Sequence, residues 1–350
     1  MFHTLGAFWN QSFFLPQPTL TEKNLPDQTG KVFIITGANT GIGYHVAAIL
    51  YSLNAKVYVG ARSESKATEA IASIKKLHPS SKGALEYLHL NLSDLTTIKG
   101  TAEEFMRRES KLHWLDNNAG VMIPPAGSKG AQGMDLQFQT NILGPFLLTK
   151  LLLPVLKRTA ESEPTGTVRV SWAGSLAVDL GSPKGGMAWK SASDGVSTLD
   201  DSHGIRTNYG ISKAANYFLG NEFAKRFGER DGVMHNVSTL FQDTRNRLMT
   251  LMNKQSYNPG NLKSDLQRHT SGLVRRLIDL MLYPAVFGAY TELYAGLSQE
   301  LTMKGDQGLF IAPWGRRASV RKDLEDEVVK EDGQAAKLFE WCDRVTKEYA

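Results

Sequence analysis

Tyr209 and Lys213, in the segment Tyr209-Gly-Ile-Ser-Lys213, are residue types that could carry out acid–base chemistry together. Four residues apart on a helix, a phenol and an ammonium lie on one face, one turn from each other. A tyrosine ordinarily has a pKa near ~10, and a neighbouring cation lowers that pKa by favouring the phenolate. Tyr209 is therefore a candidate proton donor and acceptor for a carbonyl or hydroxyl group. The same spacing also describes an ordinary amphipathic surface pair, so the assignment depends on the rest of the chain.

A glycine-rich turn near the start of the chain predicts a binding site for a pyrophosphate. Residues 32–35 are a short apolar run typical of a buried parallel strand, and an apolar-periodic helix begins near residue 42. A glycine turn between them would expose backbone amides and the positive end of the helix dipole to an anion. The spacing is G-x-x-x-G-x-G rather than the general fingerprint G-x-G-x-x-G, so the turn alone also fits an ordinary glycine-rich loop.

Four motifs occur in one order along the chain: Thr36-Gly-x-x-x-Gly-Ile-Gly43, Asn117-Asn-Ala-Gly120, Tyr209-x-x-x-Lys213 and Pro259-Gly260. Together they resemble the short-chain dehydrogenase/reductase family, and within it the fungal members related to retinol-dehydrogenase-like reductases. The resemblance covers about residues 20 to 320, nearly the whole chain. It implies an oxidoreductase that binds a nicotinamide cofactor and acts on a small-molecule alcohol or ketone.

The elements that must position these motifs alternate between strand and helix, which predicts an α/β, doubly wound parallel sheet (Rossmann fold) in a single domain. We expect an N-terminal arm over residues 1–28 that packs on the body, a catalytic domain over 29–320 that includes a substrate-covering segment, and a helical tail over 321–350, broken at Gly333. The expected strands lie near 31–36, 56–60, 85–91, 113–117, 167–172, 233–237 and 308–312, and the expected helices near 42–53, 64–77, 95–108, 136–158, 209–227 and 285–297.

Composition narrows the class of protein further. The chain has 350 residues, 41% of them apolar, and a formal net charge of +5, with basic residues spread rather than clustered in the stripe that a nucleic-acid partner would require. A lone cysteine, Cys342, excludes an internal disulfide and suits a reducing compartment. No run approaches the ~18 apolar residues of a membrane span. We expect a cytoplasmic protein without a metal site, with peripheral membrane contact through its aromatic N-terminal arm as an alternative.

The resemblance implies roles for the catalytic residues. Tyr209 would be the general acid in carbonyl reduction and the base in the reverse direction, while Lys213 would lower its pKa and hold the nicotinamide ribose. Asn141 would position a water for proton relay; capping or bending of the long helix is its alternative role. The two helices at 136–158 and 209–227 would form the interface of a homodimer.

The catalytic serine of the family has two candidates in this chain. Aligning the strand through Val168, Val170 and Trp172 places Ser175 at the catalytic position, where its hydroxyl would donate to a developing alkoxide. Ser171 would lie inside the strand and is the alternative. The long separation between Ser175 and Tyr209 contains a polar, Gly- and Ser-rich loop over 183–207 that could border the substrate entrance.

The end of the second strand bears on the choice of cofactor. An NAD enzyme usually places a carboxylate there for the ribose 2′-hydroxyl, but this chain has Ala61 followed by Arg62. No carboxylate at the end of this strand would repel a 2′-phosphate, and the guanidinium group of Arg62 could bind one. We therefore predict NADP(H) rather than NAD as the cofactor. The family's adenine-contacting acid is Asn91 here, whose side-chain carbonyl still offers an acceptor. The resemblance implies further cofactor contacts from Gly37, Asn39, Gly41, Ile42, Gly43, Leu92, Asn118, Ala119, Gly120, Pro259, Gly260, Leu262 and Ser264.

One segment departs from the family pattern, in which the sixth strand runs almost directly into the Pro-Gly turn. Here residues 238–255 intervene before Pro259, and their removal would restore a near-family join. Our hypothesis is an unspliced, in-frame intron in the gene model; a genuine surface insertion with a short amphipathic helix is the alternative. If the segment is real, it must loop out without moving Pro259.

We therefore predict an NADP-dependent enzyme that interconverts a carbonyl and an alcohol on a lipophilic small molecule. An apolar stretch over 273–287 lies where the family covers its substrate, although core packing explains it as well. The resemblance to fungal enzymes suggests secondary metabolism. The alternatives are a non-catalytic NADP-binding sensor or regulator on the same fold and an inactive product of a mis-spliced gene model. A sensor should have lost Tyr209 or Lys213, and both are present.

Overall fold

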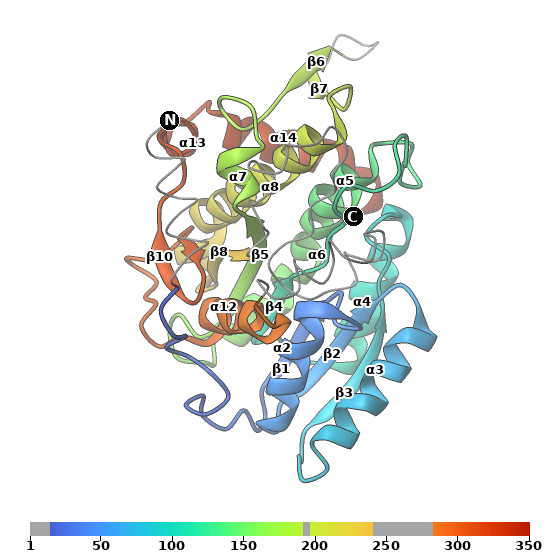
Figure 1. Cartoon of the computed structure of the whole chain (residues 1–350), viewed down its shortest axis with the longest axis vertical. Coiled ribbons are helices and arrows are strands. Elements are labelled where there is room, and N and C mark those ends of the chain that lie inside the picture. Colours follow the sequence, from blue (N-terminus) through green and yellow to red (C-terminus); the bar gives the residue numbers. More distant parts are fainter. Residues whose placement is uncertain (1–14, 192–196, 241–282) are drawn as a thin grey trace, which may run out of the picture.

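The computed structural model describes residues 15–191, 197–240 and 283–350, and within these ranges the chain builds one large sheet (Figure 1). The strand order is β10–β9–β8–β5–β4–β1–β2–β3. All neighbouring pairs are parallel except β10 with β9, which confirms a doubly wound α/β fold. The strands are β1 (Val32–Thr36), β2 (Lys56–Ala61), β3 (Ala84–His89), β4 (Trp114–Asn117), β5 (Arg169–Ser175), β8 (Met234–Leu240), β9 (Phe310–Ala312) and β10 (Arg316–Ala318).

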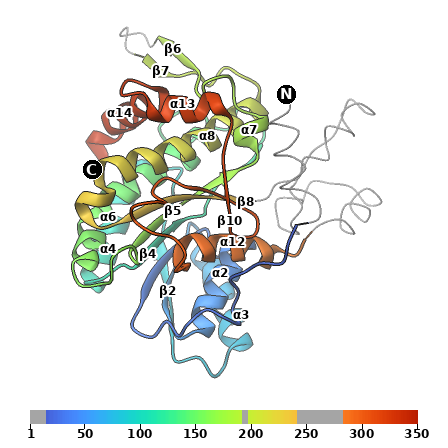
Figure 2. The same cartoon turned by 90° about the vertical axis from the view of Figure 1, so that its left-hand side faces the viewer.

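Helices cover both faces of this sheet (Figure 2). The alternation of side chains along β1 shows why both faces attract helices. Phe33 and Ile35 belong to a core with α2 (Gly41–Ser52), α3 (Glu64–Leu77) and α12 (Ala285–Leu297). Ile34 points the other way, into a core with α4 (Ile98–Arg108), α6 (Gly144–Ala160) and α8 (Ile205–Phe223). Since both faces are buried, the strands read as continuous apolar runs, which is the pattern that revealed them.

The predicted elements are present, with shifted ends. The helix expected at 136–158 consists of α5 (Leu136–Phe138), a π-helical stretch η2 (Gln139–Leu143) and α6, and the helix expected at 95–108 opens with the turn η1 (Leu95–Thr97). Helix α8 begins at Ile205 rather than at 209, after Gly204, so Tyr209 lies in its second turn. The helix continues through η3 (Ala224–Gly228) and α9 (Glu229–Asp231).

The loop expected over 183–207 is partly regular, which the sequence did not reveal. After α7 (Ala177–Leu180), β6 (Trp189–Ser191) and β7 (Ser197–Leu199) pair as a hairpin. The indole of Trp189 donates to Gln334 at 2.6 Å and packs edge-on against Trp341. The hairpin is therefore tied to the C-terminal tail, and its polar composition reflects exposure rather than irregular structure.

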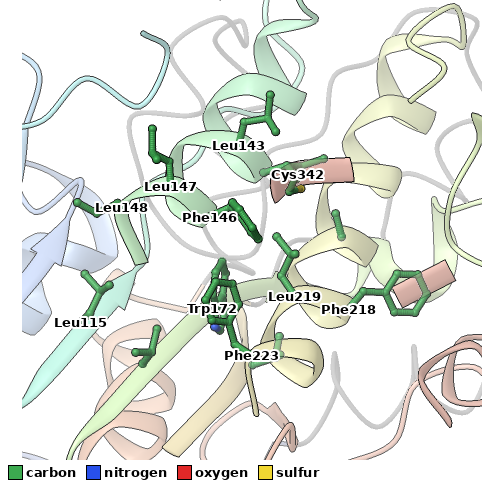
Figure 3. Close-up of a cluster of buried hydrophobic side chains, with 14 of the residues drawn as sticks. Leu115, Leu143, Phe146, Leu147, Leu148, Trp172, Phe218, Leu219, Phe223 and Cys342 are labelled. Atoms are coloured by element: carbon green, nitrogen blue, oxygen red, sulfur yellow. The ribbon is translucent and has the colours of Figure 1, made fainter. Parts of the chain in front are cut away.

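The tail folds as predicted into helices separated near Gly333: α13 (Lys322–Val329) and α14 (Gln334–Thr346), followed by the turn η5 (Lys347–Tyr349). Helix α14 lies over α8 and α6. The Phe339 ring meets Phe146 of α6 and Phe223 of α8 at centroid distances of 5.1 and 5.2 Å. Cys342 is fully buried in the same cluster, as expected for a structural cysteine (Figure 3).

This packing predicts a monomer rather than a dimer through α6 and α8. A dimer of that kind needs the outer faces of the two helices exposed, but the aromatic side of α14 already covers α8 and packs against part of α6. Displacing α14 would uncover Phe339 and Trp341, whose burial is worth several kcal/mol. We expect the full chain to sediment as a monomer at micromolar concentration. A stable dimer in sedimentation velocity would contradict this expectation.

Three further sequence-based expectations concern the N-terminal arm, the proposed insertion and the absence of a membrane span. In the N-terminal arm, Leu25 is buried against the body, while residues 1–14 lie outside the described residues. Of the proposed insertion 238–255, the first three residues end β8 and pair with Ala173, Gly174 and Ser175 of β5. Residues 241–255 lie outside the described residues. Among the helices described, one (Leu136–Ala160) is apolar and long enough to cross a membrane, but 78% of its most apolar window is buried in the core.

Candidate active site

The candidate residues converge at the carboxyl edge of the sheet, because parallel strands end on the same side. Thr36 ends β1, Asn117 ends β4 and Ser175 ends β5, with α8 passing beside β5 (Figure 1). Strands β1 and β4 are neighbours although they are distant in sequence, so the order of the sheet reverses between them. Crevices at such a reversal are where open α/β sheets bind their ligands.

The glycine turn after β1 has the geometry of an anion cradle. Gly37 and Gly41 have φ angles of +70° and +61°, a region that side chains with a Cβ rarely adopt. The amide of Gly37 donates to the Gly60 carbonyl at 2.7 Å and fixes the turn to β2. Helix α2 then begins with no acidic residue in its first turn and no side-chain cap. Its amides and dipole can therefore serve a phosphate, which fits the pyrophosphate of a dinucleotide.

Thr36 links this turn to the segment after β4, a role that we did not predict from the sequence. Its hydroxyl donates to the Asp116 carbonyl at 3.0 Å and accepts from the Ala119 amide at 2.9 Å. The Asn118 side chain donates to the Thr36 carbonyl at 2.6 Å. A Cβ on Gly43 would lie 2.5 Å from that Asn118 nitrogen. The two motifs thus form one rigid unit, and the motif position of Thr36 was the signal that could have revealed its role.

Tyr209 and Lys213 are both buried, on the face of α8 that meets β5. The Lys213 ammonium lies 5.8 Å from the centroid of the Tyr209 ring. It donates to the Ala173 carbonyl at 2.8 Å, an acceptor shared with the side-chain amide of Asn216. Burial lowers the pKa of Lys213 to about 8, partly opposed by the charge of Glu292. The lysine therefore stays an ammonium below about pH 8 and loses its proton above it.

Asn141 lies in the π-helical stretch η2 and joins the helix to the active-site loop. Its side-chain nitrogen donates to the Val121 carbonyl at 2.9 Å and to the Ser212 hydroxyl at 3.0 Å. Its oxygen accepts from the Val121 amide at 2.8 Å. A Cβ on Gly120 would lie 3.2 Å from Asn141 and 3.6 Å from the Lys213 nitrogen. Asn141 and Lys213 therefore both face Gly120. The helix is distorted into a π-helical stretch at Asn141. The water-positioning role and the helix-bending role expected for Asn141 are therefore compatible.

The two serine candidates occupy different places on β5. Ser175 is the last residue of the strand, at the carboxyl edge, and its hydroxyl accepts from the Ala177 amide at 3.1 Å. Ser171 lies within the strand, opposite Asp116 of β4, and its hydroxyl accepts from the Trp114 indole at 2.8 Å. The geometry favours Ser175 over Ser171 as the residue that meets a substrate.

The remaining predicted contacts surround the glycine turn or lie outside the described residues. Arg62 is exposed just after β2 and makes no ion pair with any described residue. The Asn91 side-chain oxygen, the acceptor expected for an adenine, already accepts from the amide and hydroxyl of Ser93. Leu92 is buried, and Asn39 and Ile42 are half-buried at the glycine turn.

Four of the predicted cofactor contacts lie outside the described residues: Pro259, Gly260, Leu262 and Ser264. The described residues contain no group of three or more His, Cys, Asp or Glu side chains able to hold a metal ion.

Comparison with known proteins decides the family. A family model for short chain dehydrogenases matches residues 31–171. A short-chain dehydrogenase/reductase from Phomopsis amygdali is 42% identical over 99% of this chain and 98% of its own length. The chain belongs to the short-chain dehydrogenase/reductase family. Another member, from Neocamarosporium betae, is 38% identical over 99% of this chain and 94% of its own. As a member of this family, the protein is an oxidoreductase that binds a nicotinamide cofactor.

Solved structures agree on the fold of this short-chain dehydrogenase/reductase. A crystal structure of an uncharacterized protein from Mycobacterium paratuberculosis has a TM-score of 0.63 and 23% identity, covering 94% of this chain and 97% of its own. An NADPH-bound carbonyl reductase from chicken fatty liver has a TM-score of 0.59 and 20% identity, covering 86% and 97%. At these identities the likeness concerns the fold alone.

Proposed function

We propose that this protein is an NADP(H)-dependent oxidoreductase that interconverts a ketone and a secondary alcohol on a lipophilic small molecule. One observation carries the proposal: a buried ammonium, Lys213, lies beneath a buried phenol, Tyr209, at the carboxyl edge where the glycine turn can hold a dinucleotide. An ordinary surface pair would be exposed, and its lysine would keep the pKa of a solvated amine.

The chemistry of the chain's own residues follows from this arrangement. A bound nicotinamide supplies or accepts the hydride. In reduction, the Tyr209 hydroxyl donates the proton to the carbonyl oxygen, and the Ser175 hydroxyl donates a hydrogen bond to the same oxygen as negative charge develops on it. The Lys213 ammonium favours the phenolate that remains and so lowers the barrier to proton transfer. In oxidation the same groups act in reverse, with Tyr209 as the base.

The preference for NADP(H) rests on Arg62. Its guanidinium follows β2 next to the glycine turn, is exposed, and has no described carboxylate partner to compete with a 2′-phosphate. We expect Arg62→Ala to raise the Kd for NADPH by roughly tenfold to a hundredfold and to leave the Kd for NADH unchanged, because only NADPH carries that phosphate.

Fluorescence titration of both cofactors measures this difference. Arg107→Ala is a matched control: Arg107 is also exposed, but it lies in the last turn of α4 and pairs with Glu104. An equal loss of NADH and NADPH affinity in Arg62→Ala would contradict the assignment of the 2′-phosphate to Arg62.

The lipophilic character of the substrate is supported by an aromatic cluster beside the glycine turn. Trp314 packs against Tyr283 and Phe287 at centroid distances of 5.1 and 5.2 Å, and Ile42 of the turn packs against this cluster. Rings beside the cofactor turn suit an apolar ketone or alcohol. The fungal origin of the relatives supports a role in secondary metabolism.

The direct test combines cofactor binding with turnover. The purified chain should bind NADPH and oxidise it in the presence of at least one lipophilic ketone from a panel. Binding of NADPH without turnover on any ketone, together with no effect of Tyr209→Phe, would favour the alternative of a non-catalytic sensor.

A further inference from the structure

The C-terminal tail holds the segment that follows the candidate serine. Helix α7 begins two residues after Ser175, and α13 lies beside it (Figures 1 and 2). The contact is made by Arg321, the residue that precedes α13. Its side chain is only 17% exposed, and a guanidinium withdrawn from water needs hydrogen-bond acceptors around it. No step of the proposed mechanism uses this arginine.

Arg321 binds the carbonyl groups at the end of α7. Its guanidinium donates to the Asp179 and Ser182 carbonyls at 3.0 Å each and to the Pro183 carbonyl at 2.7 Å. Its backbone amide donates to the Asp179 carboxylate at 2.7 Å. The last carbonyls of a helix have no partner within the helix, so a cation that bonds them acts as a cap. Arg321 therefore fixes where α7 ends.

A carboxylate fixes the orientation of this guanidinium. Asp323, in the first turn of α13, accepts from Nε and from one terminal nitrogen of Arg321 at 3.0 and 2.9 Å. This two-pronged contact suits the planar guanidinium group. The same carboxylate accepts from the Gly185 amide at 2.8 Å. We call Arg321 and Asp323 the tail clamp, because together they bond the backbone from residue 179 to residue 185 to the tail.

The clamped segment borders both hydroxyl groups that would meet the substrate. At its start, the Ala177 amide donates to the Ser175 hydroxyl at 3.1 Å. At its end, Gly181 lies against α8, where a Cβ on Gly210 would be 2.2 Å from the Gly181 carbonyl carbon. Gly210 directly follows Tyr209 in the chain. A displacement of α7 would therefore move the Ser175 hydroxyl relative to Tyr209.

Apolar packing brings the tail and α7 together but does not fix their orientation. Val178 of α7 and Val320 and Leu324 of the tail belong to one buried cluster. A Cβ on Gly186 would lie 2.7 Å from the Phe218 ring of α8 and 2.9 Å from Leu324. Apolar burial is non-directional, whereas hydrogen bonds to a planar guanidinium have a defined direction. The tail clamp therefore supplies the orientation that this packing lacks.

We propose that the tail clamp is a positioning device for the active site. Arg321, oriented by Asp323, fixes α7 so that the Ser175 and Tyr209 hydroxyls converge on one substrate oxygen. This inference deepens the proposed function and rests on it, since it assumes that both hydroxyls act on the substrate. It gives the C-terminal tail a part in turnover, although the tail lies beyond the residues that the family model matches.

The first test is the kinetics of Arg321→Ala in ketone reduction. The kcat should fall by about tenfold to a hundredfold, because misplacing a catalytic group by ~1 Å costs a rate factor of that order. The KM for the ketone and the Kd for NADPH should each change by less than about threefold, since the glycine turn belongs to β1 and α2 rather than to α7. A merely structural role would lower the melting temperature and leave kcat unchanged well below it. That result would overturn the proposal.

Arg317→Ala is the matched control. Arg317 also bonds a carboxylate, Asp306 at 2.9 Å, and a backbone carbonyl, that of Glu300 at 3.0 Å, but neither partner belongs to α7. The kcat of this variant should stay within about twofold of wild type. Equal losses of kcat in Arg317→Ala and Arg321→Ala would show a general effect of the tail on stability and would overturn the proposal.

Asp323→Asn tests the tail clamp even if Arg321→Ala does not fold. The amide oxygen can still accept from the Gly185 amide, but the charge that orients Arg321 is gone. The kcat should therefore fall by about threefold to tenfold, because hydrogen bonds to an ionised group are roughly twice as strong as neutral ones. An unchanged kcat in Asp323→Asn would contradict the positioning role.

Hydrogen exchange measures the tail clamp without turnover. The amides of residues 177–186 should exchange about tenfold faster in Arg321→Ala than in wild type and at the wild-type rate in Arg317→Ala. Unchanged exchange over this segment in Arg321→Ala would overturn the proposal. If exchange rises as expected while Tyr209→Phe proves fully active, the proposed function has failed and the contact between the tail and α7 has not. The two failures are therefore distinguishable.

Discussion

Tyr209→Phe should lower kcat/KM for NADPH-dependent ketone reduction by roughly 10²- to 10⁴-fold, the usual contribution of a positioned general acid. The substitution removes the phenol oxygen and leaves the ring, which is buried on α8 over the Lys213 ammonium. The turn that holds the cofactor is unaltered, so the Kd for NADPH should change by less than about threefold. Steady-state kinetics and NADPH fluorescence titration measure the two effects separately.

Tyr217→Phe is the matched control for this prediction. Tyr217 lies two turns further along α8, is also buried, and packs against Phe218 and Phe310. The activity of this variant should stay within about twofold of wild type, since no step of the proposed mechanism uses the Tyr217 hydroxyl. Full activity in Tyr209→Phe would refute the assignment of Tyr209 as the acid. Equal losses in the two variants would show that the effect comes from packing.

Gly43→Ala should abolish or strongly weaken cofactor binding, raising the Kd for NADPH by about a hundredfold. The new Cβ would lie 2.5 Å from the Asn118 side-chain nitrogen and 3.1 Å from the Gly37 carbonyl. Asn118 cannot yield without breaking its bond to the Thr36 carbonyl, so the first turn of α2 must move away from the glycine turn. The amides that would hold the pyrophosphate then lose their common direction. NADPH fluorescence titration measures the change in Kd.

Gly100→Ala is the control for the effect of the added methyl group. Gly100 lies on α4, and a Cβ there would meet nothing within 4 Å. Alanine is the better helix former by about 0.5–1 kcal/mol, so this variant should be at least as stable as wild type and bind NADPH normally. Wild-type NADPH affinity in Gly43→Ala would show that the crowding at Asn118 is relieved at no cost to the site.

Much of the fold follows from local pattern. Strands buried on both faces read as short apolar runs, and for that reason β1, β2 and β4 lie close to where the sequence predicts them. The tail breaks at Gly333 as expected. The hairpin β6–β7 and the edge strand β10 were not predicted, because their residues are polar or exposed and no apolar run marks them. The hairpin is also held by a partner far along the chain, Gln334, which accepts a hydrogen bond from Trp189.

Some features of the active site can likewise be predicted from local sequence, and others cannot. Tyr209, Lys213 and the glycine turn can be found from spacing, because a helix turn or a glycine φ angle is a local property. The choice between Ser171 and Ser175 depends on where β5 ends, and its register with β4 and β8 determines that end. The link from Asn141 to α8 through Ser212 joins residues 71 positions apart in the chain, so no local pattern could reveal it.

The family, the doubly wound sheet and the residue types of the acid–base pair can be recognised in the chain before folding, because glycine turns, buried strands and helix spacing are properties of short segments. The surroundings of Lys213 cannot, because they form only when the chain folds. Folding buries the ammonium and brings the Ala173 carbonyl of β5 to it. The electrostatic field at a site depends on burial and on charges contributed by distant elements, and neither can be read from the spacing of residues along the chain.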